Sequence, residues 1–343
     1  MSKISSEPYK VSVLVPVYGV ERFIEKFTRS IFEQTYHNLE IIFVDDCTPD
    51  RSIKILRDVL NEYPNRTVQT TILRHEHNRG LAAARNTLLY AATGKFVTIV
   101  DSDDWIEPDM IDTLVTKQIE TNADIVSANF FENDKTINPN YINPNFKNKW
   151  DALNYMVCLN LHHEVCGRLY QRSLFIANDI HWAEGNNICE DLSMTPRLLW
   201  YARNVAWVDR SLYHYVKNES SLTHSEKTTV QKVKAAIEAY NNFKSVMLFF
   251  KDKDVELYGK ARLSGLKFCY CIMYASLNGL PKLWREWHKH LLYTYSTSEQ
   301  KAVLGCKVAA ILHFPLNYYI LRIYFKLAEV CRAKRIFHIC RYQ

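Results

Sequence analysis

The first 130 residues alternate between short apolar runs and amphipathic segments, and this alternation limits the possible folds more than any other feature. Runs rich in β-branched residues stand at 11–18, 40–46, 70–75 and 95–104, and apolar residues at helical spacing follow them. Strands that are apolar on both faces are typical of parallel sheets covered by helices. We therefore predict an α/β fold with a Rossmann-like, mixed and mostly parallel sheet flanked by helices.

The segments between and after these runs predict further elements. Helices are expected at residues 21–34, 52–60, 82–92 and 108–121, and another strand is expected at 123–131. Gly94 follows the third helix and is expected to cap its C-terminus. Residues 133–149 are rich in Asn, Pro and Lys, which indicates a loop, whereas the chain from residue 228 onward is expected to be almost wholly helical.

Charge is distributed unevenly along the chain. Residues 1–225 carry 23 basic and 29 acidic side chains, whereas residues 226–343 carry 20 and 8, so the overall net charge of +6 combines −6 with +12. We therefore expect two parts with a boundary near Ser225, of which the second is a basic, helical C-terminal region. A basic part of this size usually meets an anionic partner, such as nucleic acid, a membrane surface or a phosphorylated substrate.

Acidic residues follow two of the expected strands. Asp45 and Asp46 end the second strand, and Asp101, Asp103 and Asp104 end the fourth. The carboxyl ends of parallel strands share one edge, where open α/β sheets bind ligands, so these acids are expected to converge. Asp101 and Asp103 share a face and could hold Mg²⁺ or Mn²⁺ together with phosphate oxygens; the alternative is a solvated acidic turn.

Two other acidic pairs each allow two interpretations. Asp45 or Asp46 could form a helix cap or an Asx turn, or could accept hydrogen bonds from a base or a ribose. Glu190 and Asp191 stand at the expected start of a helix. There they could simply complement the helix dipole, or one of them could act as a general base toward an attacking hydroxyl.

Several common signatures are missing from the sequence. It contains no GxGxxG fingerprint, no P-loop, no HExxH and no GxSxG motif. Its nine cysteines include no CxxC pair, which favours reduced thiols, and the N-terminus has no apolar segment of a signal peptide. The longest apolar stretch, residues 303–325, is interrupted by Lys307, His313, Pro315 and Arg322, so no membrane-spanning helix is expected.

Five motifs follow one another between residues 10 and 224. They are VSVLVPVYGVERFIEKFTRSIFEQTYHNLEIIFVDDCTPD, NRGLAAARNTLLYAATGKFVTIVDSDDWIEPDMI, VCGRLYQRSLF, ICEDL and YHYVKNESSLTH. In this order they resemble the family 2 glycosyltransferases, which have a GT-A fold. The resemblance implies that residues 1–225 form a catalytic domain that uses a nucleotide sugar, with UDP as the expected nucleotide, and inverts the anomeric centre.

The resemblance also implies roles for individual residues. Those expected to bind the nucleotide sugar are Pro16, Tyr18, Asp46, Arg85, Asp101 and Lys217. Asp103, with Asp101, is expected to hold Mn²⁺ or Mg²⁺. Asp191 is expected to be the catalytic base, with Glu190 beside it. Residues 213–224 are similar to the loop that closes over the donor in this family.

The sequence departs from the family pattern in three places. Gly19 stands where Asn is frequent, and residues 47–50 read Cys-Thr-Pro-Asp where Gly-Ser-Thr-Asp is usual. Lys217 stands where Arg is common, so a planar fork of donors is replaced by a point charge. These departures concern the details of nucleotide contact.

The C-terminal 22 residues hold six Lys or Arg against a single acid, with apolar residues between them. This pattern predicts an amphipathic helix on an anionic lipid surface, or a helical appendage that packs its apolar face on the catalytic domain. A polyprenyl-diphosphate-linked acceptor would favour the first interpretation, with the protein peripheral on the cytoplasmic, inner face of the cell membrane. A homodimer through these helices is a further possibility, and no nucleic-acid module is present.

The resemblance implies transfer of a hexosyl or N-acetylhexosaminyl group to a hydroxyl of a glycan or lipid-linked acceptor. It also implies a step of surface polysaccharide synthesis, as of capsule or lipopolysaccharide. The alternative is a non-catalytic sugar-nucleotide or membrane-binding scaffold, against which the intact Asp101, Asp103 and Asp191 argue. A processive synthase would need transmembrane helices and a QxxRW motif, and a nucleotidyltransferase would need a glycine-rich N-terminal signature.

Overall fold

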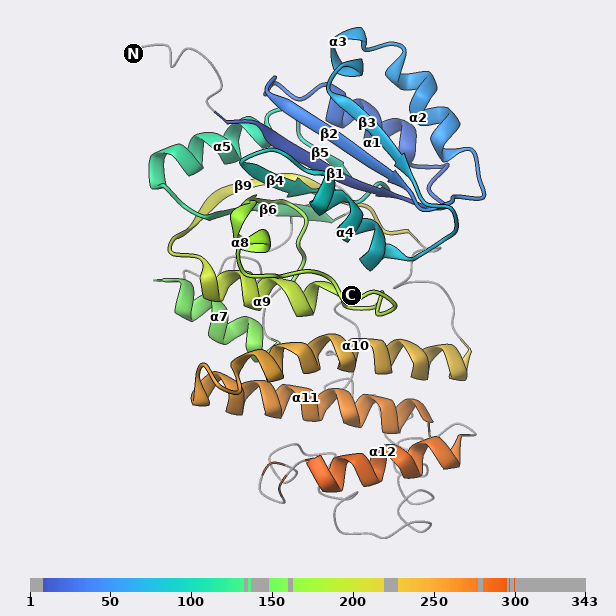
Figure 1. Ribbon diagram of the computed structural model, residues 1–343, viewed down its shortest axis with the longest axis vertical. Coiled ribbons are helices and arrows are strands. Elements are labelled where there is room, and N and C mark those ends of the chain that lie inside the picture. Colours follow the sequence, from blue (N-terminus) through green and yellow to red (C-terminus); the bar gives the residue numbers. More distant parts are fainter. Residues whose placement is uncertain are drawn as a thin grey trace. The chain divides into compact units, whose positions relative to one another are not determined.

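The structure divides into two compact units (Figure 1). The computed structural model describes residues 9–132, 135–136, 148–159, 163–218, 228–276, 280–294, 296 and 299. The first unit comprises residues 1–153, 161–187 and 194–218, and the second comprises 154–160, 188–193 and 219–343. The boundary expected near Ser225 lies outside the described residues.

A mixed sheet of nine strands forms the centre of the first unit in the described part of the chain. The strands are β1 (Val11–Val17), β2 (Leu39–Asp45), β3 (Thr70–Arg74), β4 (Phe96–Ile99), β5 (Trp105–Ile106), β6 (Ile125–Glu132), β7 (Lys135–Thr136), β8 (Arg168–Gln171) and β9 (Val205–Tyr215). Their order is β3-β2-β1-β4-β8-β6-β9-β5, with β7 paired to β6. The first four of these strands run parallel to one another, as do β6 and β9, whereas β8 runs antiparallel between β4 and β6. The predicted mixed, mostly parallel sheet is confirmed.

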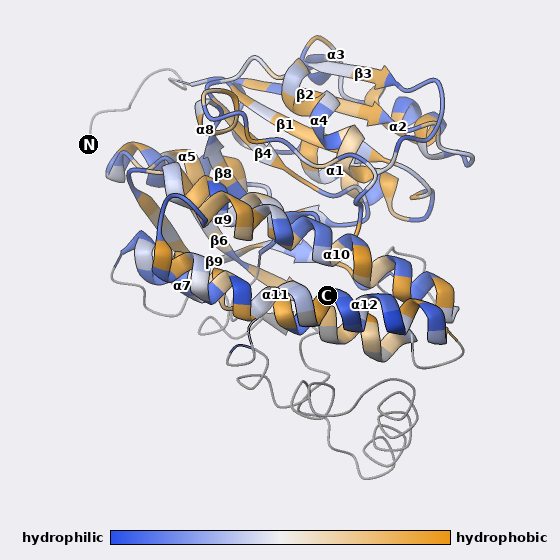
Figure 2. Cartoon of the chain, turned by 60° about the horizontal axis from the view of Figure 1, so that its bottom comes forward, coloured by the Kyte–Doolittle hydropathy of each residue, from blue (hydrophilic) through white to orange (hydrophobic). Residues whose placement is uncertain are grey.

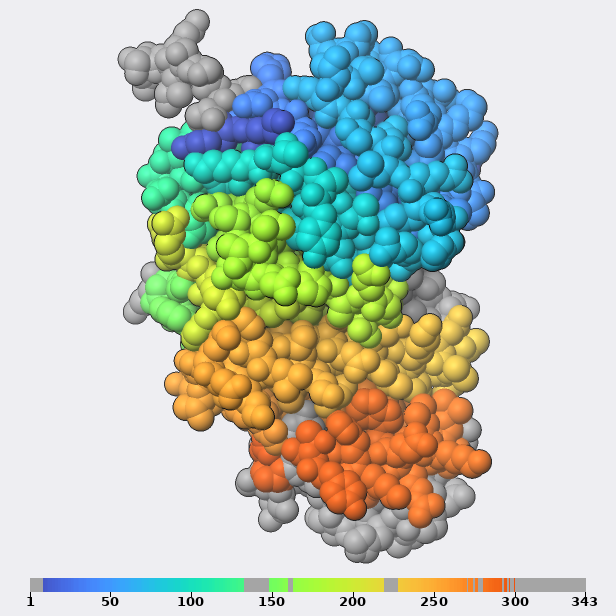
Figure 3. Space-filling view, viewed as in Figure 1, coloured from blue at the N-terminus to red at the C-terminus, as the bar shows by residue number. Residues whose placement is uncertain are grey.

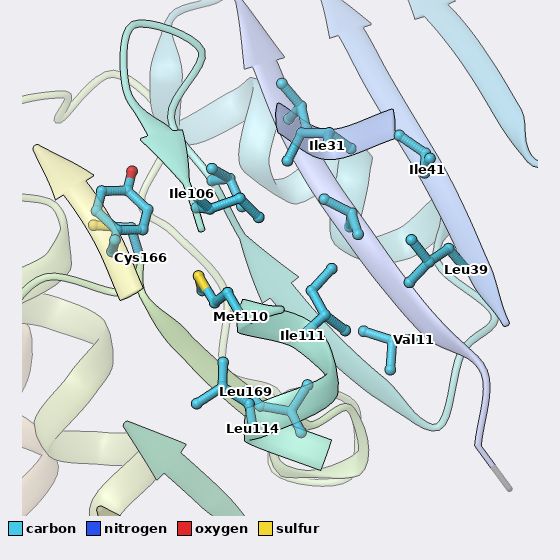
Figure 4. Close-up of a cluster of buried hydrophobic side chains, with 14 of the residues drawn as sticks. Val11, Ile31, Leu39, Ile41, Ile106, Met110, Ile111, Leu114, Cys166 and Leu169 are labelled. Atoms are coloured by element: carbon cyan, nitrogen blue, oxygen red, sulfur yellow. The ribbon is translucent and has the colours of Figure 1, made fainter. Parts of the chain in front are cut away.

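Helices cover both faces of this sheet. The helices that pack on it are α1 (Ile24–Phe32), α2 (Ser52–Leu60), α4 (Leu81–Ala91) and α5 (Met110–Thr121). The other helices before residue 202 are α3 (Pro64–Thr67), α7 (Lys149–Val157), α8 (Ser173–Ile176) and α9 (Asp191–Tyr201). Alternate residues of β1, such as Val11 and Val13, join apolar side chains of α1, α2 and α5 in one buried cluster (Figure 4). Helix α4 contributes nothing to that cluster and packs on β1 and β2 from the other face.

The second unit is helical where it is described. Its main helices are α10 (Thr229–Phe250), α11 (Val255–Ser276) and α12 (Pro281–Thr294), and they pack in chain order. Thr228 and Gln231 form a capping box that starts α10. Hydrophilic and hydrophobic residues alternate around these helices (Figure 2), and side chains of α12 form part of the visible surface (Figure 3). Within the described ranges, no helix combines the length and low charge that crossing a membrane requires.

Gly94 differs from the expectation, because it does not cap α4. The helix ends at Ala91, and its C-cap is Ala92 in an extended conformation. Gly94 instead lies against β1, where its N–H donates to Ser12 Oγ over 2.9 Å. A Cβ at this position would lie 2.6 Å from Ser12 Oγ and 2.8 Å from the Ser12 backbone nitrogen. Close approach of two backbones, rather than helix capping, therefore requires glycine here.

This contact predicts that Gly94→Ala lowers the free energy of unfolding by about 1–3 kcal/mol, because the added methyl overlaps a fixed backbone. The control is Gly259→Ala in α11, where an added Cβ meets nothing within 4 Å. That change should stabilise the helix by about 0.5–1 kcal/mol. Thermal and urea unfolding of both variants check the prediction, and an unchanged stability of Gly94→Ala would contradict it.

Asp50 joins the loops that follow β1 and β2. Its Oδ1 accepts hydrogen bonds from Thr48 Oγ1 (2.8 Å), Ser52 N–H (3.0 Å) and Ser52 Oγ (2.6 Å). Its Oδ2 accepts the N–H of Glu21 over 3.0 Å. Burial acts to raise the pKa of Asp50, but the hydrogen bonds from Ser52, Thr48 and Glu21 outweigh it and hold that pKa below its ordinary value.

A lowered pKa in the folded state makes the contribution of Asp50 depend on pH. The stabilisation is fully present above the unfolded pKa of about 3.9 and is lost as the pH falls through the lower, folded value. We expect Asp50→Asn to cost about 1–3 kcal/mol of unfolding free energy at pH 7 and clearly less near pH 3. Asp58→Asn, at an exposed position of α2, is the control and should cost little at either pH. A cost for Asp50→Asn that does not change with pH would show that its ionised form is not what stabilises the loops.

Candidate functional site

Asp101 and Asp103 lie in the turn that directly follows β4. Asp101 Oδ1 accepts a hydrogen bond from Arg85 over 2.8 Å, and Arg85, in α4, is only 2% exposed. Asp103 Oδ2 accepts the side-chain amide of Asn218 over 3.1 Å. Desolvation and the negative charge of Asp101 raise the pKa of Asp103. Two carboxylates that repel each other beside a buried arginine form a site in which a cation and an anion could be held together.

Asp104, the third acid of this motif, turns inward. It is 4% exposed, its Oδ2 accepts the Tyr213 hydroxyl over 2.5 Å, and its Oδ1 accepts the N–H of Val216 over 2.8 Å. Burial, followed by the charges of Asp103 and Asp101, raises its pKa well above the ordinary value. The sequence groups Asp104 with the other two acids. In the structure its carboxylate is instead hydrogen-bonded to the segment that contains Tyr213 and Val216.

The end of β1 meets the same turn. Ser102 Oγ donates to the carbonyl oxygen of Pro16 over 2.7 Å, which joins β1 to the residues after β4. Tyr18, just beyond β1, is 50% exposed. The structure thus brings Pro16, Arg85 and Asp101 to one edge of the sheet, as the sequence predicts for strand ends.

Asp46 lies at the end of β2 and is buried. Its Oδ1 accepts the Arg79 N–H (2.8 Å) and bonds to His75 Nδ1 (2.6 Å), while its Oδ2 accepts the Gly80 N–H (2.8 Å). Asp46 therefore fixes the turn that leads into α4, the helix that carries Arg85. A carboxylate offers about four acceptor positions, so three of them are used within the protein.

Two neighbours of Asp46 have local roles. Asp45 Oδ1 accepts the Thr48 N–H over 2.8 Å, which matches the turn interpretation of this acidic pair. Cys47 has a φ of +58°, a conformation that favours glycine. This backbone conformation gives a physical reason for the glycine that the family usually has there, and the substitution by Cys47 retains the turn.

The N-terminus of α4 is held from a second direction by Asn187. Its Oδ1 accepts the Ala82 N–H over 3.0 Å, and it lies so close to Gly80 that a Cβ there would approach its side chain to 2.5 Å. Gly80 also has a φ of +88°. Asp46 and Asn187 together fix where α4 begins, and so where Arg85 lies.

Glu190 and Asp191 belong to the second unit, whereas the acids described above belong to the first. Asp191 is the first residue of α9, and Glu190 is 7% exposed. The carbonyl of Glu190 accepts the Ser193 N–H (3.1 Å) and the Ser193 hydroxyl (2.7 Å). In the same unit, the Asn242 side chain of α10 donates to the Ile188 carbonyl over 2.9 Å, which anchors the segment before the acidic pair.

Lys217 follows β9 and is exposed. Its neighbours on either side, Val216 and Asn218, are bonded to Asp104 and Asp103. The rest of the expected closing loop, residues 219–224, lies outside the described residues. The hydrogen bonds of Tyr213, Val216 and Asn218 to the acid turn are not predicted by the sequence analysis. The third acid of the DSDD motif is the sequence feature that could have indicated them.

No group of three or more His, Cys, Asp or Glu side chains suited to a metal occurs in the part of the chain that the structure describes. Asp101 and Asp103 can supply at most two carboxylates. That donor set fits Mg²⁺ or Mn²⁺, which bind oxygen ligands and commonly fill their remaining positions with water and substrate phosphates.

The chain is similar in sequence and fold to known proteins. The family model "Glycosyl transferase family 2" matches residues 12–177. Glycosyltransferase GlyA of Streptococcus pneumoniae is 32% identical over 226 residues, which are 62% of this chain and 31% of GlyA, so the match spans less than half of that relative. EpsJ of Bacillus subtilis, described as an uncharacterized glycosyltransferase, is 30% identical over 247 residues, which are 68% of this chain and 70% of EpsJ.

A solved structure shows the same fold. The crystal structure of S. aureus TarS 1–349 in complex with UDP-GlcNAc superposes with a TM-score of 0.68 at 19% identity, over 93% of this chain and 92% of that chain. This likeness shows the fold, and the family model and the match to EpsJ show the family. The chain belongs to the family 2 glycosyltransferases and has their GT-A fold.

Proposed function

We propose that the chain is an inverting glycosyltransferase that moves a sugar from a UDP-sugar to a hydroxyl of a glycan or lipid-linked acceptor during surface polysaccharide synthesis. The observation that carries this proposal is the cluster of Arg85, Asp101 and Asp103 at the carboxyl edge of the parallel strands. It combines a buried cation with two acids at the edge where open α/β sheets bind ligands.

The donor is held by residues of the first unit. Pro16, Tyr18 and Asp46 line the base, and Asp101 accepts hydrogen bonds from the ribose. Among the described residues Asp46 bonds to three groups, and a carboxylate has about four acceptor positions, so one more hydrogen bond, from a base N–H, could be accepted. The fold shared with TarS, solved with UDP-GlcNAc, supports UDP as the nucleotide and leaves a hexosyl or an N-acetylhexosaminyl group as the transferred sugar.

The diphosphate is the part of the donor that develops negative charge as the sugar departs. Asp103 and Asp101 would hold Mn²⁺ or Mg²⁺, which when bound supplies electrostatic stabilisation of that charge. Arg85 orients the carboxylate of Asp101 through its 2.8 Å hydrogen bond. Lys217 adds a positive charge from the residues that follow β9.

Asp191 removes the proton from the acceptor hydroxyl. A hydroxyl is a weak nucleophile at neutral pH, and a carboxylate at the first position of α9 is stabilised in its ionised form by the helix dipole. A single displacement with one base and no covalent intermediate inverts the anomeric centre, by the same logic that separates inverting from retaining glycosidases. Glu190 stands beside this base, and the hydrogen bonds to its backbone carbonyl shape the first turn of the helix.

The basic second unit holds the enzyme near its acceptor. Lys282, Arg285 and Lys289 are exposed along α12, and they add to the basic residues of the C-terminal segment. We propose that this charge attracts the inner face of the cell membrane, where a polyprenyl-diphosphate-linked acceptor would be met. A homodimer through the same helices is a separate proposal, which vesicle binding does not exclude and which the mass of the protein in solution tests.

The base assignment predicts that Asp191→Asn reduces transfer by at least about a hundredfold, the scale of general base catalysis. Binding of UDP should stay within about twofold of wild type, because Asp191 acts on the acceptor. The measurement is transfer to an acceptor glycan alongside calorimetric titration with UDP and Mn²⁺. Asp179→Asn, whose side chain is 91% exposed, is the control and should be fully active. Wild-type turnover by Asp191→Asn would remove this residue from the mechanism.

The metal assignment predicts that Asp103→Asn raises the Mn²⁺ concentration for half-maximal donor binding by about tenfold or more, because a charged ligand becomes neutral. A thermal-shift titration with nucleotide sugars and Mn²⁺ measures this, since a ligand at 100 times its Kd stabilises by about 2.7 kcal/mol. Asp209→Asn, at an exposed position of β9, should bind as wild type does. An unchanged Mn²⁺ requirement in Asp103→Asn would contradict the assignment, and the absence of any shift with wild type would favour a scaffold.

A further inference from the structure

Two segments far apart in sequence, residues 101–104 and 213–218, are joined by four hydrogen bonds. Tyr213 donates its hydroxyl hydrogen to Asp104 Oδ2 (2.5 Å), and the same hydroxyl accepts the Asp101 N–H (3.2 Å). Asp104 Oδ1 accepts the Val216 N–H (2.8 Å), and Asp103 Oδ2 accepts the Asn218 amide (3.1 Å). The turn of residues 101–104 and the segment of residues 213–218 are therefore held in one fixed arrangement.

The strands next to these segments extend the connection. Trp105 and Ile106 of β5 pair with His214 and Tyr213 of β9. The ring of His214 stacks between Trp105 and Phe131, with centroid distances of 3.2 and 4.3 Å. The backbone around Tyr213 thus has little freedom to move independently of the acid turn.

The polar groups that make this connection are buried. Tyr213 is 0% exposed, Asp104 4% and Asn218 7%. Burying a carboxylate and a phenol is costly unless their hydrogen bonds are complete, and removing one partner leaves the other uncompensated. A purely apolar contact could join a strand to a turn without this desolvation cost. The buried polar connection therefore suggests a role in the neighbouring site.

Lys217 is the residue whose position this connection would fix. It lies between Val216 and Asn218, and each of these neighbours is bonded to an acid of the turn. We propose that Asp104 and Tyr213 are positioning residues that fix Lys217 relative to Asp101 and Asp103, so that a donor diphosphate is held between the lysine and the acid pair. This inference rests on the proposed function and adds two residues to it that contact neither donor nor acceptor.

A positioning role predicts coupling that a purely structural role does not. If the Tyr213 hydroxyl acts by placing Lys217, the double variant should lose no more diphosphate affinity than the variant that lacks the lysine alone. The two losses of affinity are then not additive. If Tyr213 only stabilises the fold, the two effects on binding are independent and add.

The test is a double-mutant cycle on the full chain, with UDP and Mn²⁺ as the probe in calorimetric titration. Tyr213→Phe and Lys217→Ala should each weaken UDP binding by about tenfold, and the double variant should also be weakened by about tenfold rather than a hundredfold. Tyr63→Phe is the control, because it removes a tyrosine hydroxyl that is hydrogen-bonded to Glu33 (2.6 Å) in the same unit, away from the acid turn. It should bind UDP as wild type does.

Additive losses, or unchanged binding by Tyr213→Phe, would overturn the positioning role while leaving the proposed function intact. If Tyr213→Phe does not fold, Asp104→Asn replaces it in the cycle, since Asn keeps the shape and an acceptor for the Val216 N–H. A wild-type protein that binds neither UDP nor UDP-sugars in the presence of Mn²⁺ would overturn the proposed function itself, and the positioning role with it.

Discussion

Parallel pairing of β1 with both β2 and β4 is the constraint on which the candidate site depends. Val17 is in register with Asp45, and Leu14 is in register with Ile99, so all three strands end at the same edge. The pairing is enforced by apolar side chains on both faces, which α1, α2 and α5 cover on one side and α4 on the other. Residues that are far apart along the chain therefore meet at one edge because the strands that precede them are buried together.

Hydrogen bonding divides the acids at this edge into two groups. Asp46, Asp50 and Asp104 have their oxygens occupied by donors from the protein and hold turns in place. Asp101 and Asp103 are half-buried; each accepts one side-chain hydrogen bond, from Arg85 and from Asn218, and the pKa of Asp103 is raised by desolvation and by the charge of Asp101. The short DSDD motif thus contains the two acids proposed to bind ligand, Asp101 and Asp103, and a third acid, Asp104, that is bonded to the segment after β9.

Much of the first unit could be predicted from the sequence, because its strands and helices are local patterns. The apolar runs give β1 to β4 within a few residues, and the acidic strand ends give the location of the site. The insertion of β8 between β4 and β6 could not be predicted, since it depends on antiparallel pairing between segments about 70 residues apart. Local pattern predicts that Gly94 caps a helix, whereas its real constraint is contact with Ser12 of β1. The bonds from Tyr213 to Asp104 were missed for the same reason, because nothing in either segment alone indicates its partner.

The central claim is that the turn after β4 binds a metal and a nucleotide diphosphate together. It is tested most directly by a crystal structure of the protein grown with UDP and Mn²⁺, with anomalous diffraction used to locate manganese. The account predicts one strong anomalous peak within coordination distance of Asp103, about 2.0–2.3 Å, with the diphosphate bound to the same ion. UDP bound with no manganese at Asp101 or Asp103, or manganese bound elsewhere, would contradict it.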